Sequence, residues 1–146
     1  MTNYHFQWPL KNYKLGTAYG VVDEAHPNGH RGADFNGVPE GTPLLAVCDS
    51  QVVNVLTSKM LGNIVVLRVG SKFFAYCHMQ KPTDLKIGQV IKAGTVVGKL
   101  GNTGTASSGP HLHLVLGWDK FCAITGTVAD PVKFIHDKIE EEKKAA

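Results

Sequence analysis

Short apolar runs, each closed by glycine, proline or another turn-forming residue, follow one another along most of this sequence. Glycine occurs 16 times and proline 7 times in 146 residues. The runs are rich in β-branched and aromatic side chains and lack helical periodicity, which is typical of strands. Many short strands joined by glycine turns predict a mainly β chain folded as an antiparallel sandwich or barrel.

The runs also predict which segments turn back on themselves. We expect strands over residues 44–47, 52–56, 63–69, 73–78, 90–91, 95–100 and 111–116. Gly70 and Ser71 would turn one hairpin, between 63–69 and 73–78. Ala93 and Gly94 would turn another, between 90–91 and 95–100.

A helix is predicted at the C-terminal end. Asp130 can cap it and Pro131 suits its first position. Val132, Ile135 and Ile139 then follow at spacings of three and four, which places them on one helical face.

Length and composition bound the organisation of the chain. With 43% hydrophobic residues, 146 residues can bury one core. We expect a single domain made of an N-terminal strap (1–15), a β core (16–130) and the helix with its tail (131–146).

Composition also restricts the partners. The net charge of +3 comes from scattered residues, so we expect no nucleic-acid partner. No apolar run of about 18 residues and no signal-like N-terminus occur, so we expect neither membrane insertion nor a secretory signal. Three widely spaced cysteines, Cys48, Cys77 and Cys122, fit small buried hydrophobes rather than a disulfide framework.

The histidines carry the functional signal. His111 and His113 alternate with leucines in HLHLVL, so in a strand both point to the same face. Two exposed histidines on a half-exposed strand would fit this short pattern as well as a metal site does.

Two further segments supply polar side chains of the same kind. His30 and Asp34 lie four residues apart, about 13 Å in a full strand, so sharing an ion requires a bend that Gly29 and Gly32 permit. A loop with an ordinary polar contact is the alternative. His78 ends the run KFFAYCH, where alternation places it on the face of Phe74 and Tyr76, and it fits a structural histidine too.

Together these residues are more specific than each is alone. His30, Asp34 and one histidine of the H-x-H pair provide three ligands, the number in a catalytic zinc site that leaves a position for water. The helical H-E-x-x-H motif of many zinc proteases is absent, so a protease of that kind is not expected.

The order of these motifs resembles the lysostaphin-type (LytM-type) zinc endopeptidases, which cut peptidoglycan peptides. The resemblance covers roughly residues 16 to 135 and includes the segments HRGAD, EGTPLLAVCDSQVVNV, LGNIVVLRV, AYCHM, IGQVIKAGTVVGKLGNTGTASSGPHLHLVL and ADPVKFI. It implies a duplicated hybrid motif, a distorted antiparallel β sandwich, and an enzyme that acts on bacterial peptidoglycan. We expect the protein to be a monomer.

The resemblance also implies the role of each site residue. His30, Asp34 and His113 would ligate Zn²⁺. His111 would act as general base on the zinc-bound water, and His78 would help to stabilise the oxyanion. The connection WDKFCAITGTVADP is longer than is usual in this family, and we expect its Trp118 and Phe121 to line the cleft.

Two other functions remain as alternatives. A non-catalytic wall-binding or regulatory module has the same fold, but such modules usually lose ligands that this chain keeps. A lipoyl or biotinyl carrier would need a lysine on an exposed turn, whereas Lys99 lies within a strand run. A phage lysin, held in the host cytoplasm until release or carried on the virion, is the expected biological setting.

Overall fold

The computed structural model describes residues 5–145, which form strands followed by a C-terminal helix. The elements are β1 (Lys14–Leu15), β2 (Ala33–Asn36), β3 (Pro43–Leu45), β4 (Ser50–Ser58), β5 (Gly62–Val69), β6 (Lys72–Met79), β7 (Val90–Ile91), β8 (Val96–Lys99), β9 (Leu112–Gly117), β10 (Val128–Ala129) and α1 (Pro131–Ala145). Among these residues, no helix has the length and apolar character needed to cross a membrane.

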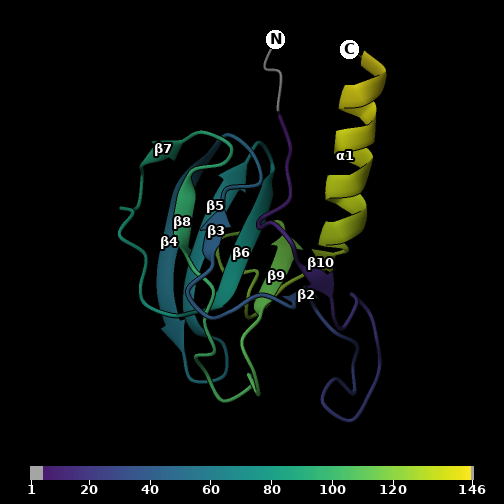
Figure 1. The fold of residues 1–146 in the computed structure, drawn as a ribbon, viewed down its shortest axis with the longest axis vertical. Coiled ribbons are helices and arrows are strands. Elements are labelled where there is room, and N and C mark those ends of the chain that lie inside the picture. Colours follow the sequence, from purple (N-terminus) through teal and green to yellow (C-terminus); the bar gives the residue numbers. More distant parts are fainter. Residues whose placement is uncertain (1–4, 146) are drawn as a thin grey trace.

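The strands form two antiparallel sheets. The large sheet has the order β1-β2-β9-β6-β5-β4-β7, with β10 paired to β9, and the small sheet consists of β3 and β8. Figure 1 shows β3 and β8 lying against the large sheet, with α1 beside its β9 side. The prediction of a mainly β, antiparallel sandwich with a C-terminal helix is confirmed.

One predicted hairpin is confirmed and the other is wrong. Val69 pairs with Lys72, so Gly70 and Ser71 form the turn of β5 and β6. β7, in contrast, pairs with β4 in the large sheet, while β8 pairs with β3 in the small sheet. The chain therefore crosses from the large sheet to the small one at the predicted turn. The prediction failed because apolar alternation identifies a strand but not its partner.

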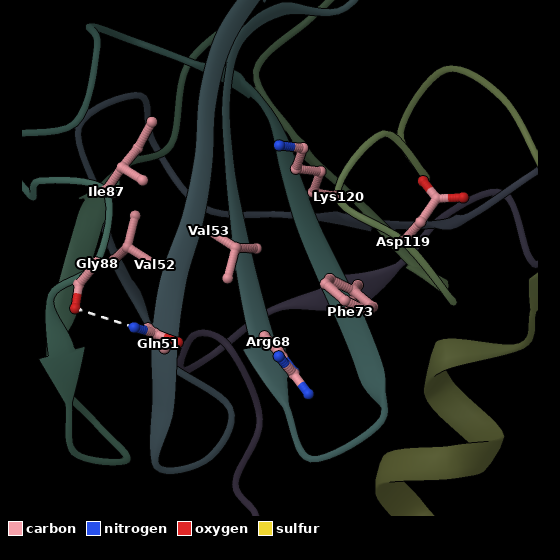
Figure 2. Close-up of a pocket in the computed structure, with 9 residues that line it drawn as sticks. All are labelled: Gln51, Val52, Val53, Arg68, Phe73, Ile87, Gly88, Asp119 and Lys120. Carbon is pink, nitrogen blue, oxygen red and sulfur yellow. Dashed lines mark hydrogen bonds between the residues drawn. The ribbon is translucent and has the colours of Figure 1, made fainter.

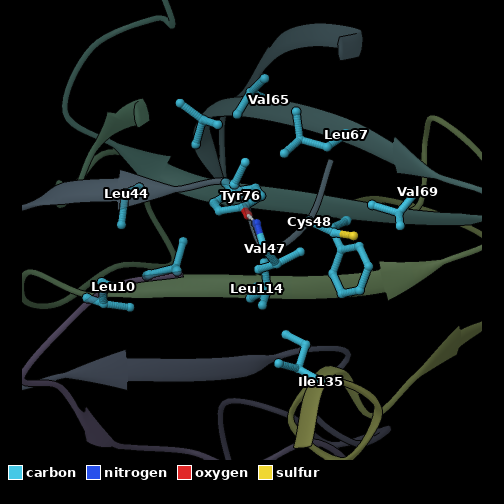
Figure 3. Packing of buried hydrophobic residues seen from close by; sticks show 14 of the residues in the cluster. Leu10, Leu44, Val47, Cys48, Val65, Leu67, Val69, Tyr76, Leu114 and Ile135 are labelled. Carbon is cyan, nitrogen blue, oxygen red and sulfur yellow. Dashed lines mark hydrogen bonds between the residues drawn. The ribbon is translucent and has the colours of Figure 1, made fainter. Parts of the chain in front are cut away.

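The main core fills the space between the two sheets. Figure 3 shows Tyr76, Leu67 and Leu114 of the large sheet packed among Leu44 and Val47. The N-terminal segment and α1 close this core through three buried side chains, Phe6, Leu10 and Ile135. The helix begins as predicted, with the Asp130 carboxylate accepting hydrogen bonds from the amides of residues 132 and 133.

A second apolar cluster lies on the opposite, outer face of the large sheet. Its members from the sheet are small or β-branched, and the loop 118–127 covers them with Cys122 and Ala123. Cys48, Cys77 and Cys122 are buried and free, and burial raises the pKa of the Cys122 thiol to about 12. The loop therefore rests on the same face that carries the site described below.

A buried tyrosine joins the two sheets and allows a test of the core. The Tyr76 hydroxyl donates to the Leu45 carbonyl oxygen at 2.9 Å and accepts from the Val47 amide at 3.1 Å. Tyr76→Phe leaves both buried backbone groups without that partner. We expect the free energy of unfolding in urea to fall by about 1–3 kcal/mol.

Tyr13→Phe is the matched control for that variant. The Tyr13 hydroxyl makes no hydrogen bond to another described residue, so the free energy of unfolding of this variant should change by less than about 0.5 kcal/mol. Equal effects of the two substitutions would show that the Tyr76 bonds contribute nothing specific to stability.

Candidate metal centre

Three predicted ligands come together where β2 lies beside β9. Asp34 and His113 are directly paired across these strands, so their side chains share a face. His113 Nδ1 lies 3.1 Å from Asp34 Oδ1 and 3.1 Å from His30 Nε2, and His30 Nε2 lies 3.4 Å from Asp34 Oδ1. All three ligand atoms fall within 4.8 Å of one another.

The predicted bend brings His30 to this position. His30 precedes β2, and its amide and carbonyl groups bond to the backbone of Val21 and Gly20. Gly32 passes so close to β9 that a Cβ atom there would lie 2.4 Å from the Leu114 carbonyl oxygen. Any larger residue at position 32 would push the two ligand-bearing segments apart.

Hydrogen bonds prepare the three groups to bind a cation. Burial opposes ionisation of Asp34, but its bonds with His113 and His30 outweigh that effect and lower the pKa of the carboxyl. Burial dominates at His113 and lowers the pKa of this imidazole. The Nδ1–H of His30 donates to the Ala18 carbonyl oxygen at 3.2 Å, which leaves the Nε2 lone pair facing the other ligands.

The donor set fits a divalent transition metal. Two imidazole nitrogens and one carboxylate oxygen face one another with few other polar partners, and together they carry a single negative charge. Three such ligands leave a coordination position for a water or substrate atom. The buried nitrogens of His30 and His113 face each other at 3.1 Å, close enough for one ion to contact both.

His111 lies next to these ligands and is oriented by its own loop. Its Nδ1–H donates to the Gly109 carbonyl oxygen at 2.8 Å, and the Ser107 hydroxyl lies 3.3 Å away. Nε2 of the same ring lies 3.8 Å from Asp34 Oδ1. The ring therefore directs Nε2 toward the candidate centre, which is the position that a general base would need.

His78 reaches the site through a backbone feature that alternation did not predict. The expected placement on the face of Phe74 and Tyr76 is wrong, because the register of β5 and β6 shifts opposite His78 and its φ is 61°. This left-handed residue turns the side chain to the outer face. Its ring lies 4.7 Å from that of His111 and 6.0 Å from that of His113, measured between centroids.

Thr103 sets the proton arrangement of His78 and was not among the predicted site residues. Its carbonyl oxygen accepts a hydrogen bond from His78 Nδ1–H at 2.6 Å. Burial lowers the pKa of His78 to about 4. At neutral pH the ring is therefore neutral with an unprotonated Nε2. The segment GNTG was part of the resemblance, but a backbone carbonyl leaves no trace in a motif.

The remaining histidines differ in their distance from the centre. The His26 ring lies 4.3 Å from that of His30 and bonds to Asp23, so it borders the site. His5 pairs with Glu142, and His136 is exposed on α1, so both lie away from it. Trp118 and Phe121, expected to line the cleft, are about half exposed on loop 118–127.

The metal-free protein should become less stable on acidification. Between its ordinary pKa of 6.5 and about 4, His78 binds a proton in the unfolded chain but not in the folded one, so stability falls as pH falls. His113, with a lowered pKa, acts in the same direction, and Asp34 adds a loss at lower pH. At His30, burial would lower the pKa, but the hydrogen bond and charge of Asp34 outweigh burial and raise it. His30 therefore opposes the loss of stability as pH falls.

Urea midpoints at about pH 7, 5.5 and 4.5, in the presence of a chelator, measure this effect. The midpoint should fall at each step, and His78→Gln should make the decline shallower. A constant midpoint over this range, or the same slope in both proteins, would contradict the assignment to His78.

Comparison with known proteins identifies the same region. Residues 28–124 match the model of peptidase family M23. The glycyl-glycine endopeptidase ALE-1 of Staphylococcus capitis is 34% identical over 138 residues, which cover 92% of this chain and 36% of that protein. The peptidoglycan DD-endopeptidase ShyC of Vibrio cholerae is 38% identical over 85 residues, covering 58% of this chain and 19% of that protein. The chain thus spans about a third or less of these relatives.

Solved structures agree in fold. The catalytic domain of lysostaphin from Staphylococcus simulans superposes with a TM-score of 0.74 at 32% identity, covering 86% of this chain and 93% of that domain. A zinc-containing peptidase from Vibrio cholerae gives a TM-score of 0.73 at 26% identity, covering 86% of this chain and 39% of that one.

Proposed function

This chain belongs to peptidase family M23, and we propose that it is a zinc-dependent endopeptidase that hydrolyses peptide bonds in bacterial peptidoglycan. The observation that carries the proposal is the convergence of His30, Asp34 and His113 beside two further imidazoles on one face of the sheet. The two relatives described above, a glycyl-glycine endopeptidase and a peptidoglycan DD-endopeptidase, support this substrate class.

The proposed ligands suit zinc, for which imidazole and carboxylate donors are common. His30 would bind through Nε2, His113 through Nδ1, and Asp34 through a carboxylate oxygen. A bound zinc ion acts as a Lewis acid that polarises a carbonyl group and makes a water molecule more acidic. The second bond of His30, to the Ala18 carbonyl oxygen, holds its ring in the orientation that ligation needs.

His111 is the proposed general base. Its Nδ1–H is engaged by the Gly109 carbonyl oxygen, so the nitrogen that can accept a proton is Nε2, on the side of Asp34. A proton taken up at Nε2 would be stabilised by the nearby carboxylate. The same ring can then return the proton to the departing amine, as hydrolysis of a peptide bond requires.

His78 is the proposed stabiliser of the oxyanion, and the geometry adds a condition to that role. A ring that is neutral and bonded to Thr103 through Nδ1–H has no proton at Nε2 to donate. His78 can serve as a donor only if it gains a second proton while substrate is bound.

A substitution by glutamine tests the donor role of His78. Gln at position 78 supplies an amide N–H of similar reach without titrating. If His78 donates to the oxyanion, His78→Gln should retain a rate at least about tenfold above that of His78→Ala. Initial rates of peptidoglycan cleavage measure this, and equal rates for the two variants would contradict the role.

The decisive test of the function is clearing of purified peptidoglycan. We expect turbidity to fall with the protein as prepared, to stay constant after chelation, and to fall again when zinc is restored. Mass analysis of the released fragments would identify the bond. A non-catalytic wall-binding or regulatory module would bind the polymer and leave its turbidity unchanged, so the same assay separates the two functions.

The carrier alternative has no support in the fold. Lys99 pairs with Pro43 at the end of β8 rather than standing on an exposed hairpin turn.

Delivery to the wall by a phage is the proposed biological setting. A lysin would accumulate in the host cytoplasm until lysis, whereas a virion component would remain with purified particles. Detection of the protein by mass spectrometry in one of these two fractions would establish the route, and its absence from both during infection would contradict the proposal.

A further inference from the structure

A groove on the outer face of the large sheet has no part in the site described so far. Its volume is about 440 Å³, and its lining includes Gln51, Val53, Arg68, Phe73, Gly88 and Lys120. Figure 2 shows the side chains of β4, β5 and β6 forming its floor, with Gly88 on one side and Lys120 on the other.

Strand pairing places this groove on the same face as the metal centre. Arg68 is paired with Gln51 and with Phe73, so these three side chains point to one side. Phe73 lies four residues before Cys77, which pairs with His113. The groove and the centre are therefore about 13 Å apart along β6.

The loop 118–127 lies between the groove and the metal centre and contributes Asp119 and Lys120 to the lining of the groove. Cys122 packs into the outer apolar cluster in the middle of the sheet. The carbonyl oxygen of Lys120 accepts a hydrogen bond from the Asn54 side chain of β4 at 3.0 Å. The loop thus crosses the sheet from β9 to β4, with the metal centre on one side and the groove on the other.

The groove carries positive charge over an apolar floor. Neither Arg68 nor Lys120 forms an ion pair within residues 5–145; Arg68 Nε donates to the Gly70 carbonyl oxygen at 2.9 Å. Asp119 also lines the groove, and its carboxylate accepts the Phe121 amide at 2.8 Å, so two cations and one anion leave the groove with a net positive charge. In Figure 2, Lys120 and Arg68 lie at opposite ends of the floor made by Val53 and Phe73.

We propose that this groove binds a second, uncleaved peptide arm of peptidoglycan through its free carboxylate. The inference rests on the proposed function, because it takes the polymer as substrate. Stem peptides combine small apolar side chains with carboxylates, which matches an apolar floor between two cations. A second contact on the same polymer raises the local concentration of scissile bonds at the metal centre.

Binding without cleavage tests this groove directly. The His111→Ala protein is mixed with insoluble peptidoglycan from which phosphate-bearing polymers have been removed, and the sedimented fraction is measured. Adding Arg68→Gln and Lys120→Gln should weaken binding about five- to tenfold. The matched control, Lys11→Gln with Lys144→Gln, removes the same charge from exposed positions outside the groove and should leave binding unchanged.

Chemical amidation of the polymer identifies the ligand. Peptidoglycan whose carboxylates have been converted to amides should bind the parent protein only weakly. This binding should be as weak as that of unmodified peptidoglycan to the Arg68→Gln, Lys120→Gln protein. Unchanged binding by the groove variant, equal losses in the control, or dependence on phosphate-bearing polymers would each overturn the proposal. Thermal melting of every variant confirms that it is folded.

Failure of the groove proposal and failure of the proposed function can be told apart. Should the unmodified protein fail to clear peptidoglycan, the proposed function fails, while the sedimentation assay still reports on the groove. Conversely, the groove variant could cleave both short soluble muropeptides and intact peptidoglycan as fast as the parent protein does. That result would refute the proposed role of the groove and leave the proposed function intact.

Discussion

His111→Ala should lower the rate of peptidoglycan cleavage by about 10²- to 10⁴-fold while leaving the bound metal in place. The reason is geometric. His111 is not one of the three converging ligands, yet its Nε2 lies 3.8 Å from the Asp34 carboxylate, on the side where a water or substrate atom would bind. Removing the imidazole removes the proton acceptor but no metal ligand.

Three measurements make this result interpretable. Initial clearing rates give the loss of activity, metal analysis gives the zinc content per chain, and thermal melting reports on folding. The control is His136→Ala, an exposed histidine on α1, which should change none of them. If His111→Ala lost its metal together with its activity, His111 would be a ligand rather than the base.

Asp34→Asn should abolish tight metal binding and activity together. The substitution keeps the size of the side chain but removes the negative charge that His30 and His113 share. We expect the affinity for zinc to fall by at least about 100-fold. Zinc at a concentration 1,000 times its dissociation constant stabilises a folded protein by about 4 kcal/mol, and the variant should lose that gain.

Thermal melts with and without added zinc measure this stabilisation. Asp23→Asn is the control, because Asp23 is an acid of the same loop that bonds to His26 and not to the ligands. It should retain zinc-dependent stabilisation. A zinc-dependent rise in melting temperature that persists in Asp34→Asn would place the metal elsewhere.

Local patterns predicted much of the fold. The glycine turn at residues 70–71, the cap at Asp130 and the spacing of Ile135 and Ile139 depend on neighbours in the chain, and the structure has each of them. The partners of β7 and β8 were assigned wrongly, because they join segments distant in sequence. Nothing in a four-residue strand identifies which sheet edge it will meet.

In the candidate site, too, some features follow from local sequence and others from contacts between distant segments. The sequence by itself determined the residue types and the bend between His30 and Asp34, because their separation in a strand excludes a shared ion without it. Only the tertiary structure brought His78 to the outer face, through a bulge and a left-handed residue that alternation cannot reveal. Tertiary contacts also placed the Thr103 and Gly109 carbonyl groups against Nδ1 of His78 and His111. Every residue type has a backbone carbonyl, so its position, and with it the proton arrangement of the site, follows from the folded chain alone.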